Sequence, residues 1–438
     1  MSWIDERGGN HMRRMAVIAT ALFLITVLAG AALAEAQRPV TLRVVFPGTS
    51  ETEKQWSVKL KQTAESKLPG IKIEMMYIGW PDLEKKLSVM IPGGDVPDLV
   101  QQQEATTLVA MNALEPLDAY LARPDSPLKK EQFYEGVWNF SLYEGKAYTI
   151  PIRAISYGLI VREDLLTEAG MKLSDLKTWD DLKRAAKAMT KGTVYGYGYP
   201  LGLPRFAWRE GPYIAGYSNN FDLSDTSEVT KPRYLEMLRL FKDLQPFMSP
   251  TTKVMGLREA FQAWGLGNIA MMPTGDFFVA NLYPINPKIL KVSRAIAYPK
   301  GPSATKPWSP VANVGWAMFK GSKQKEEAWK ALTFFTSLEN LTEESAMLNT
   351  PARRDLDMAK LGESAARFYP QAVEENRRII NDFVTNSHPI GVPMRKIVRR
   401  EEMEVAFQKI MIEMLDGKLT PEQAYDRIKA EIDRIKRG

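Results

Sequence analysis

Near the N-terminus, segments with the apolar periodicity of strands alternate with segments that have the periodicity of helices. This order constrains the fold more than any other feature of the chain. Val40–Phe46 and Ile71–Tyr77 place apolar side chains at every second position, as strands do. A polar-capped helical stretch at about 52–67 lies between them, and a second helix follows the break at 79–82. A short apolar run at 97–100 then predicts a third strand. This order predicts a parallel sheet with crossover helices.

A second α/β pattern begins after Ile150–Ile152 and fills the middle of the chain. We expect helices at 179–189, 232–244, 257–264 and 324–337, and strands near 194–199, 268–272, 292–298 and 314–319. Two helices are the clearest elements near the C-terminus: apolar residues recur from Met403 to Met414, Gly417 suits a helix end, and Thr420–Gln423 forms a capping box. A chain of 438 residues is long enough for two domains with separate cores.

Residues 1–36 have the pattern of a cleavable secretory signal, with 1–11 as an upstream extension. Two arginines precede an apolar run from Ala16 to Ala29, and small residues offer cleavage after Ala34 or Ala36. The apolar run is shorter than the ~20 residues that a membrane-spanning helix needs. No cysteine follows it, so we expect a periplasmic protein that is not a lipoprotein.

The rarest residue types exclude several classes of enzyme. The chain has no cysteine and only two histidines, His11 and His388. The lack of cysteine excludes disulfides, thiolate nucleophiles and cysteine zinc sites. Because His11 lies in the expected signal, a Ser-His-Asp triad could be built only around His388. We therefore expect no cofactor, no metal and no catalytic residue. The net charge of +6 is weak for this length, and the basic stretch 395–400 runs into two glutamates, so we expect no nucleic-acid partner.

No nucleotide-binding or calcium-binding motif is complete. Gly196–Gly202 lacks the G-x-G-x-x-G spacing, and Pro200 stands where a helix should open. Asp222–Asp225 lacks the glycine and glutamate of a calcium loop. Paired carboxylates for glycoside hydrolysis need not be close in sequence, so a periplasmic carbohydrate-active enzyme remains an alternative. Two carboxylates about 5–10 Å apart would favour it.

Aromatic residues gather beside glycine or proline and at strand ends. They are Trp80, Tyr157, Tyr199, Trp208, Phe277, Phe278 and Trp316. Core or loop packing is expected for about half of these rings, and the others are expected to stack on the apolar faces of a sugar. Polar side chains that could bind its hydroxyls are Gln101, Gln102, Gln103, Arg153, Asp276 and Asn313. Rings with such polar groups fit a neutral polyhydroxylated ligand.

Several segments of the chain occur in an order and spacing that are specific when taken together. They are Phe46–Ser50, Gly94–Val100, Glu144–Pro151, Tyr157–Leu166, Thr178–Leu182, Phe261–Met272 with Gly275, Gly315–Trp316, Gly321–Trp329 and Thr350–Arg353. With them, the chain from about Thr41 to Ile435 resembles extracellular solute-binding proteins of the maltose-binding type, the periplasmic component of ABC importers. The resemblance implies an α/β fold of two lobes (the type II periplasmic-binding-protein fold), with parallel-rich sheets flanked by helices and a hinge between the lobes.

The resemblance also implies that the chain crosses between the lobes several times. We expect 37–151 in lobe 1, 152–300 in lobe 2, 301–350 back in lobe 1, and 351–438 in lobe 2. Matched positions suggest ligand contacts at Gln101–Gln103, where maltose-type members often have tryptophan, and at Phe277, which matches a stacking ring. Trp316 matches a ring that contacts sugar in some members of the family, and Arg353 matches another position of the family pattern. Trp80, at the start of a helix, is a further candidate for ligand contact. Asp276 is a feature of this chain alone.

The expected function is capture of a mono- to oligosaccharide by a monomeric periplasmic protein, which delivers it to an inner-membrane ABC permease without catalysis. A second hypothesis is a phosphorylated polyol or another anionic solute. Convergence of Arg153, Arg205 and Arg353 on the cleft would favour this second hypothesis.

Overall fold

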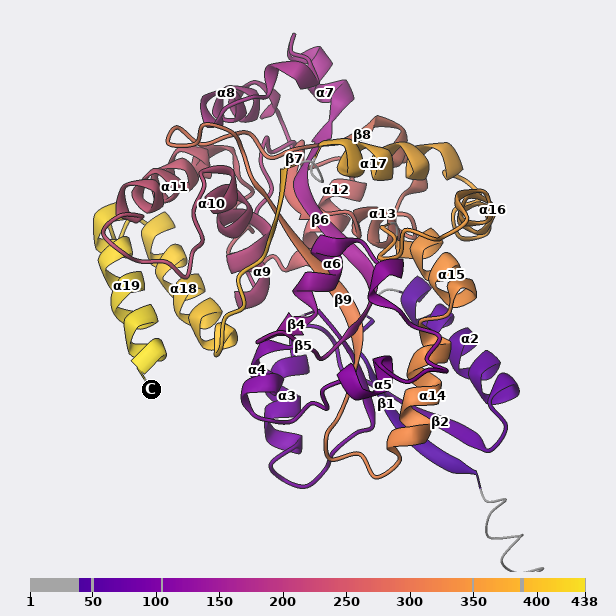
Figure 1. Cartoon of the computed structure of the whole chain (residues 1–438). Coiled ribbons are helices and arrows are strands. Elements are labelled where there is room, and N and C mark those ends of the chain that lie inside the picture. The colour runs from indigo at the N-terminus through magenta and orange to yellow at the C-terminus, as the bar shows by residue number, and fades with distance from the viewer. Residues whose placement is uncertain (1–38, 49–50, 104, 349, 387–389, 438) are drawn as a thin grey trace, which may run out of the picture.

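Two long strands, β6 (Ile150–Arg162) and β9 (Ser309–Met318), run through the centre of the molecule and belong to both of its halves (Figure 1). The computed structural model describes residues 39–48, 51–103, 105–348, 350–386 and 390–437. The expected signal at 1–36 and His388 lie outside the described residues. All of β6 except Arg162 is buried, as expected for a strand that is covered on both faces.

The main sheet has eight strands, in the order β2-β1-β3-β9-β6-β7, with β10 paired to β9 and β8 paired to β6. The other strands are β1 (Val40–Phe46), β2 (Ile71–Tyr77), β3 (Leu99–Gln102), β7 (Met271–Gly275), β8 (Ser293–Ile296) and β10 (Gly391–Pro393), and β4 (Leu142–Tyr143) and β5 (Lys146–Ala147) form a separate pair. β1 pairs in parallel with β2 and β3, as the sequence predicts. β9 pairs antiparallel with both β3 and β6. The sheet is therefore parallel at one edge and antiparallel at its centre.

The first lobe is built around β1, β2, β3 and the C-terminal end of β9. Its helices are α2 (Glu51–Lys67), α3 (Leu83–Met90), α4 (Thr106–Ala110), α5 (Asp118–Leu121) and α14 (Lys325–Phe335). α2 buries Trp56, Leu60 and Ala64, whose four-residue spacing places them on one face. α14 packs on α2, β1 and β9. Two further helices, α6 (Glu135–Phe140) and α15 (Leu338–Leu348), lie against β6.

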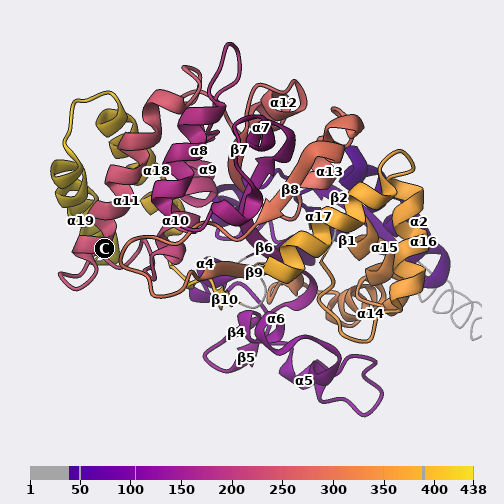
Figure 2. The same ribbon diagram turned by 90° about the horizontal axis from the view of Figure 1, so that it is seen from above.

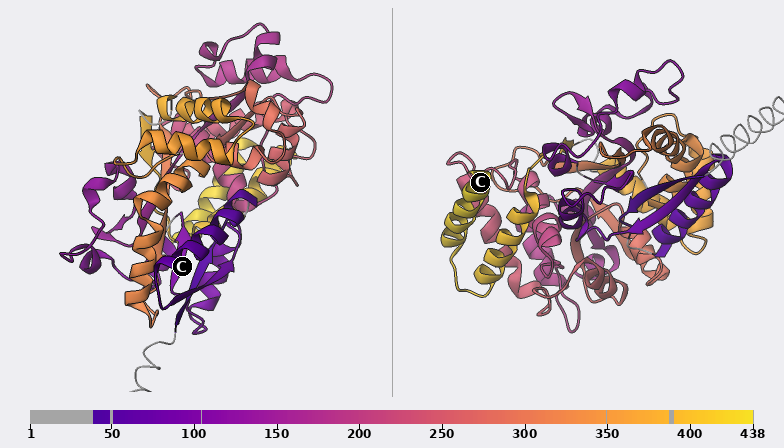
Figure 3. Two further views of the ribbon diagram at one scale, coloured as in Figure 1. Left: turned by 90° about the vertical axis from the view of Figure 1, so that its right-hand side faces the viewer. Right: turned by 90° about the horizontal axis from the view of Figure 1, so that it is seen from below.

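The second lobe is built around β7, β8 and the C-terminal half of β6. Its helices are α7 (Glu163–Glu168), α8 (Trp179–Met189), α9 (Pro204–Trp208), α10 (Ile214–Ser218), α11 (Lys231–Leu244), α12 (Leu257–Gly265), α13 (Phe278–Leu282), α17 (Val373–Asn386), α18 (Arg400–Leu415) and α19 (Pro421–Arg437). One more helix, α16 (Met358–Phe368), packs on α15. α18 packs on α9 and α19 on α11, on the opposite side of the molecule from β1 and β2 (Figure 3). From above, β6 and β9 lie between α10 and α11 on one side and α15 and α17 on the other (Figure 2). Within the described ranges, no helix has the length and apolarity to cross a lipid bilayer.

Most of the expected elements are confirmed. The N-terminal order of three strands and two helices is present, and the expected helices in the middle of the chain are α8, α11, α12 and α14. Near the C-terminus, Met403 and Met414 are buried on α18, and Gly417 has a φ of 78°. The capping box also forms, because the Thr420 amide donates to Gln423 Oε1 and the Gln423 amide donates to Thr420 Oγ1.

The expected strand at 194–199 is wrong. Tyr195 bridges to Ile269, whereas Tyr197 bridges to Met248, so nearby residues pair with different segments and no continuous ladder forms. The pairing of Ile269 with Tyr195 also explains why β7 begins later than the sequence pattern predicts, at the point where pairing with β6 starts.

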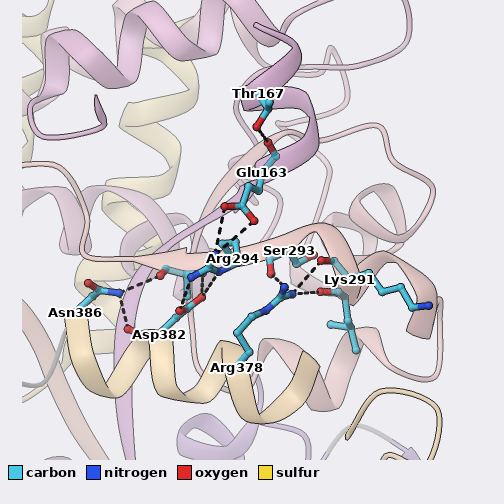
Figure 4. A network of polar contacts seen from close by, with 10 residues as sticks. Glu163, Thr167, Lys291, Ser293, Arg294, Arg378, Asp382 and Asn386 are labelled. Atoms are coloured by element: carbon cyan, nitrogen blue, oxygen red, sulfur yellow. Dashed lines mark hydrogen bonds and ion pairs between the residues drawn. The ribbon is translucent and has the colours of Figure 1, made fainter. Parts of the chain in front are cut away.

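Helix α17 is fastened to the second lobe by a network of polar contacts (Figure 4). Asp382 accepts two hydrogen bonds from the Arg294 guanidinium, at 2.7 and 2.9 Å, and a third from the Ala295 amide at 3.2 Å. Glu163 lies on the other side of Arg294, with its nearest oxygen at 3.3 Å. Arg378, one turn earlier on α17, donates to three carbonyl oxygens, those of Leu290, Lys291 and Ser293.

Replacement of Asp382 by alanine should lower the free energy of unfolding by about 2–3 kcal/mol, because it leaves the partly buried Arg294 without its bidentate partner. Urea denaturation measures the change. Arg377→Ala on the same helix is the control: its pair with Glu374 is exposed, and its loss should cost no more than about 0.5 kcal/mol. Equal losses in the two variants would contradict the assignment of α17's anchoring to Asp382.

Candidate functional site

Three strands of the first lobe end at the same edge of the sheet, and the residues that follow them begin the candidate site. Glu53 lies in the first turn of α2, soon after β1, and Trp80 lies in the turn after β2. Gln101 lies near the end of β3, and Gln103 follows it. The carboxyl ends of parallel strands are where open α/β sheets bind their ligands.

The crossing strand β9 brings a tryptophan to this edge. Gln101 of β3 lies opposite Trp316 of β9, so their side chains share one face of the sheet. Gly315 allows β6 to approach, because a Cβ atom there would stand 2.8 Å from the carbonyl oxygen of Ile150. Gln102 lies opposite Gly315 and, as the neighbour of Gln101 in a strand, points to the other face.

Four buried polar side chains meet where β3, α2, β6 and α15 come together. We call Glu53, Gln101, Arg153 and Glu344 the carboxylate cluster. The Arg153 guanidinium lies 3.7 Å from a carboxylate oxygen of Glu53 and 3.7 Å from one of Glu344. The Gln101 amide donates to Glu344 at 3.4 Å. These contacts are long for charged hydrogen bonds, so the cluster is loosely bonded for a buried group of charges.

Some buried polar atoms at this junction have no hydrogen-bond partner among the described residues. They are Gln101 Oε1, Arg153 Nη1, Trp316 Nε1, Glu344 Oε2 and Ser345 Oγ. The set includes both donors and acceptors. Native proteins rarely leave buried polar atoms unpaired, so these atoms make the junction a candidate for a bound molecule that supplies the partners.

Burial shifts the acidity of two carboxyls at this junction. It raises the pKa of Glu344 to about 8, with a smaller contribution from Glu53 and an opposing one from Arg153. It also raises the pKa of Asp276, which follows β7, to about 7. Asp276 Oδ2 accepts hydrogen bonds from the Ser156 amide and the Thr350 hydroxyl. Asp276 therefore ties β6 to the segment that follows α15.

A second group of polar side chains connects β3 with the second lobe. We call Gln103, Tyr157, Arg205, Arg209 and Glu210 the arginine cluster. Gln103 Oε1 accepts hydrogen bonds from Arg205 at 2.8 Å and Arg209 at 2.9 Å. Gln103 Nε2 donates to the Tyr157 hydroxyl at 3.0 Å. Arg209 also donates to Glu210 at 2.7 Å, and burial raises the pKa of that carboxyl.

Aromatic rings surround the two guanidinium groups. The Arg205 Cζ atom lies 5.7 Å from the centre of the Trp80 ring. The Arg209 Cζ atom lies 5.5–5.9 Å from three rings, those of Phe206, Tyr157 and Phe277. The Tyr157 and Phe277 rings meet edge to face at 6.3 Å. Cations within such distances of aromatic faces gain cation–π stabilisation.

The structure thus brings many of the predicted residues to one region between the lobes: Trp80, Gln101, Gln103, Arg153, Tyr157, Asp276, Phe277 and Trp316. It places other predicted residues outside the two clusters. Tyr199 donates to the Ala207 carbonyl at 2.5 Å inside the second lobe. Trp208 packs edge to face on Phe407 of α18, with ring centres 5.1 Å apart.

Asn313 and Arg353 also bind elsewhere. The Asn313 amide donates to the Val137 carbonyl at 2.7 Å and to Ser141 at 2.9 Å, which fastens β9 to α6. Arg353 makes a bidentate ion pair with Asp355 at 2.6–2.8 Å. Three arginines, Arg153, Arg205 and Arg353, were expected to converge if the solute is an anion. Of these, only Arg205 lies beside Arg209 and donates to Gln103.

Sequence reasoning missed Glu53, Arg209, Glu210 and Glu344. Glu53 follows a predicted strand end by a few residues, and this position is a usable signal in an open α/β sheet. Arg209 and Glu210 lie in a buried π-helix at Arg209–Tyr213. No hydrophobic periodicity in the sequence predicts this element. Glu344 is a buried carboxyl on an ordinary helix, and no local pattern distinguishes it from solvated glutamates.

An open groove of about 910 Å³ lies between α3 and α4 of the first lobe and α18 and α19 of the second. It contains none of the predicted residues, and its charged side chains are largely solvated. A cavity of only about 10 Å³ lies beside Gln103, enough for about one water molecule. We place the candidate site at the two clusters rather than in the groove, because members of each cluster have an unpartnered buried atom and none of the described residues that line the groove has one.

Glu344 should make the stability of the protein depend on pH. Its carboxyl has a pKa of about 8 when folded and an ordinary value of 4.5, so between these limits it is ionised in the unfolded chain and takes up a proton on folding. The folded state then binds more protons, so stability falls as pH rises from about 4.5 to about 8. Glu344→Gln removes this loss. The free energy of unfolding of the variant, relative to that of the wild type, should therefore increase with pH by at most about 1.4 kcal/mol per pH unit.

Urea denaturation of both proteins between pH 4.5 and 8.5 tests this. Glu339→Gln, at an exposed position in the first turn of the same helix, controls for removal of a negative charge from α15. A constant difference between Glu344→Gln and the wild type across this range would show that the Glu344 carboxyl is ionised throughout.

Comparison with known proteins agrees with this architecture. The model of the family described as bacterial extracellular solute-binding protein matches residues 48–341. A binding protein of Brucella abortus (strain 2308) is 28% identical over 283 residues, which cover 63% of this chain and 67% of that protein. The maltotriose-binding protein of Pyrococcus abyssi is 25% identical over 284 residues, 60% of this chain and 56% of that protein. An ABC transporter solute-binding protein from Thermotoga lettingae, solved with alpha-D-tagatose, has a TM-score of 0.72 at 20% identity, over 91% of this chain and 99% of that one. The chain therefore belongs to the family of bacterial extracellular solute-binding proteins.

Proposed function

We propose that this protein captures a carbohydrate of one to several sugar units between its lobes and delivers it, chemically unchanged, to the permease of an ABC importer in the inner membrane. The observation that carries the proposal is the set of unpartnered polar atoms around the carboxylate cluster. Arg153 and Trp316 offer donors there, and Gln101 offers an acceptor. A sugar hydroxyl both donates and accepts, so a polyhydroxylated solute could satisfy the whole set.

The relatives support a carbohydrate as the solute. The Pyrococcus abyssi relative is a maltotriose-binding protein, and the Thermotoga lettingae structure holds alpha-D-tagatose. The aromatic rings of Trp80 and Phe277 beside the arginine cluster supply flat apolar surfaces of the kind that stack on sugar rings.

Capture requires the two lobes to move apart and close. We propose that they hinge where β6 and β9 pair mainly with each other, near the register shift between Pro151 and Arg153. The lobe boundaries at 151/152, 300/301 and 350/351 belong to this proposal. Closure would bring Gln103 of the first lobe onto Arg205 and Arg209 of the second.

The compartment is also part of the proposal. Residues 1–36 would direct export and be removed after Ala34 or Ala36, which leaves a periplasmic monomer without a lipid anchor. The family description, extracellular solute-binding protein, supports export. The N-terminal residue of the protein recovered from a periplasmic extract checks the cleavage site.

A sugar that binds at the clusters should stabilise the protein and alter its tryptophan fluorescence. A ligand at one hundred times its Kd adds about 2.7 kcal/mol to the free energy of unfolding. Thermal shift and fluorescence titrations against neutral sugars, uronates and sugar phosphates measure both effects, and chromatography of the recovered ligand shows whether it is unchanged. Consumption of the sugar would contradict a carrier role. Failure of every carbohydrate to bind would contradict the proposed solute class.

Replacement of Gln101 by leucine removes an acceptor from the carboxylate cluster while keeping a side chain of similar volume. It should weaken carbohydrate binding about tenfold, the cost of roughly one unpaired buried polar group. Isothermal titration calorimetry with the best ligand of the panel measures the effect. Gln262→Leu, at an exposed position on α12, is the matched control and should leave Kd unchanged. Unchanged affinity in Gln101→Leu would remove Gln101 from the binding site.

A further inference from the structure

Two guanidinium groups converge on a single neutral oxygen in the arginine cluster. Arg205 and Arg209 both donate to Gln103 Oε1, at 2.8 and 2.9 Å. Arg209 has Glu210 as an acidic partner, whereas none of the described carboxylates forms an ion pair with Arg205. Arg205 Nε is in addition buried without a hydrogen-bond acceptor.

The surroundings of this pair are poor in negative charge. Burial, and then the positive charge of the neighbouring Arg209, lower the pKa of the Arg205 guanidinium. Burial raises the pKa of Glu404, an acidic group of α18 that acts on Arg205, to about 7, so its carboxyl carries only part of a negative charge at neutral pH. Aromatic rings cover the guanidinium faces and keep the local dielectric low, which strengthens the attraction of the pair for an anion.

The Gln103 amide has the shape of a carboxylate. Its oxygen lies between the two guanidinium groups, and its nitrogen lies 3.0 Å from the Tyr157 hydroxyl. A carboxylate in the same plane would place one oxygen between Arg205 and Arg209. Its second oxygen would accept the proton of the Tyr157 hydroxyl, where the amide nitrogen can only donate. Gln103 follows the last residue of β3, so the ladder does not hold its backbone.

We propose that the solute carries a carboxylate, as a uronic acid does, and that Arg205 and Arg209 bind this carboxylate in the place that the Gln103 side chain fills in the structure. This inference rests on the proposed capture of a carbohydrate and specifies its class. A phosphate group is the other oxyanion found on sugars. It is tetrahedral and bulkier than an amide, whereas a carboxylate has the planar shape of the Gln103 amide that Arg205, Arg209 and Tyr157 already bind, so the carboxylate is the better match.

The direct test is calorimetric titration of the purified protein with matched probes: D-glucuronate against D-glucose, D-galacturonate against D-galactose, the corresponding di- and trisaccharides, and the 1- and 6-phosphates of both hexoses. A uronate should bind at least tenfold more tightly than its neutral counterpart. Tighter binding of neutral sugars or of sugar phosphates would overturn the inference and leave carbohydrate capture standing. Binding of no carbohydrate at all would overturn both.

Two variants locate the effect. Arg205→Gln should weaken uronate binding at least tenfold and binding of the neutral sugar less than threefold, whereas an equal loss for both would overturn the role of Arg205. Gln103→Glu supplies the carboxylate from the protein itself. It should raise the melting temperature by about 2 °C or more and weaken uronate binding.

Gln103→Met is the control for Gln103→Glu, because it removes the amide without adding charge. If Gln103→Glu lowers the melting temperature as much as Gln103→Met does, the two arginines do not require a negative charge, and the inference is overturned. This measurement needs no ligand, so it tests the cluster even if one of the other variants fails to fold.

Discussion

The hydrogen-bonded ladder between β6 and β9 is the constraint on which the rest of the structure depends. β3 attaches the first lobe to one end of β9, and β7 and β8 attach the second lobe to the other end of β6. Among the described residues, only the short pair β4 and β5 lies outside the sheet that contains these two strands. The hinge that we propose therefore bends the stretch that the lobes share, where the register shifts between Pro151 and Arg153. Such irregularities let a paired strand bend without loss of the whole ladder.

The buried ionisable groups lie next to this shared stretch, and in our proposal their placement couples binding to closure. Arg153 projects from β6 between Glu53 and Glu344, each at 3.7 Å, while Gln103 reaches Arg205 across the junction. Closing the lobes removes these groups from water, and the protein alone does not satisfy all of their hydrogen-bonding atoms. A solute that supplies the missing partners stabilises the closed form more than the open form. This difference in affinity is what shifts a population toward closure.

The sequence predicts the elements whose periodicity is local, and it fails where pairing partners come from far away. The N-terminal strands and α18 could be located because one face of each is apolar at a fixed spacing. The strand at 194–199 could not be judged, since whether it forms a ladder depends on Ile269 and Met248. In the candidate site, Phe277 could be named as a ring at a chain break, and Gln103 as a polar side chain at a position matched by the family resemblance. Arg209 was not, because its burial arises only when a π-helix of the second lobe meets the end of β3.

A crystal structure of the protein with its solute bound tests the central claim most directly, namely that the unpartnered buried atoms between the lobes mark where the solute lies. The account predicts solute oxygen atoms within about 3.2 Å of Gln101 Oε1, Arg153 Nη1 and Glu344 Oε2. It also predicts a solute oxygen between Arg205 and Arg209. A solute seated in the groove between α3 and α18, with both clusters unchanged, would contradict it.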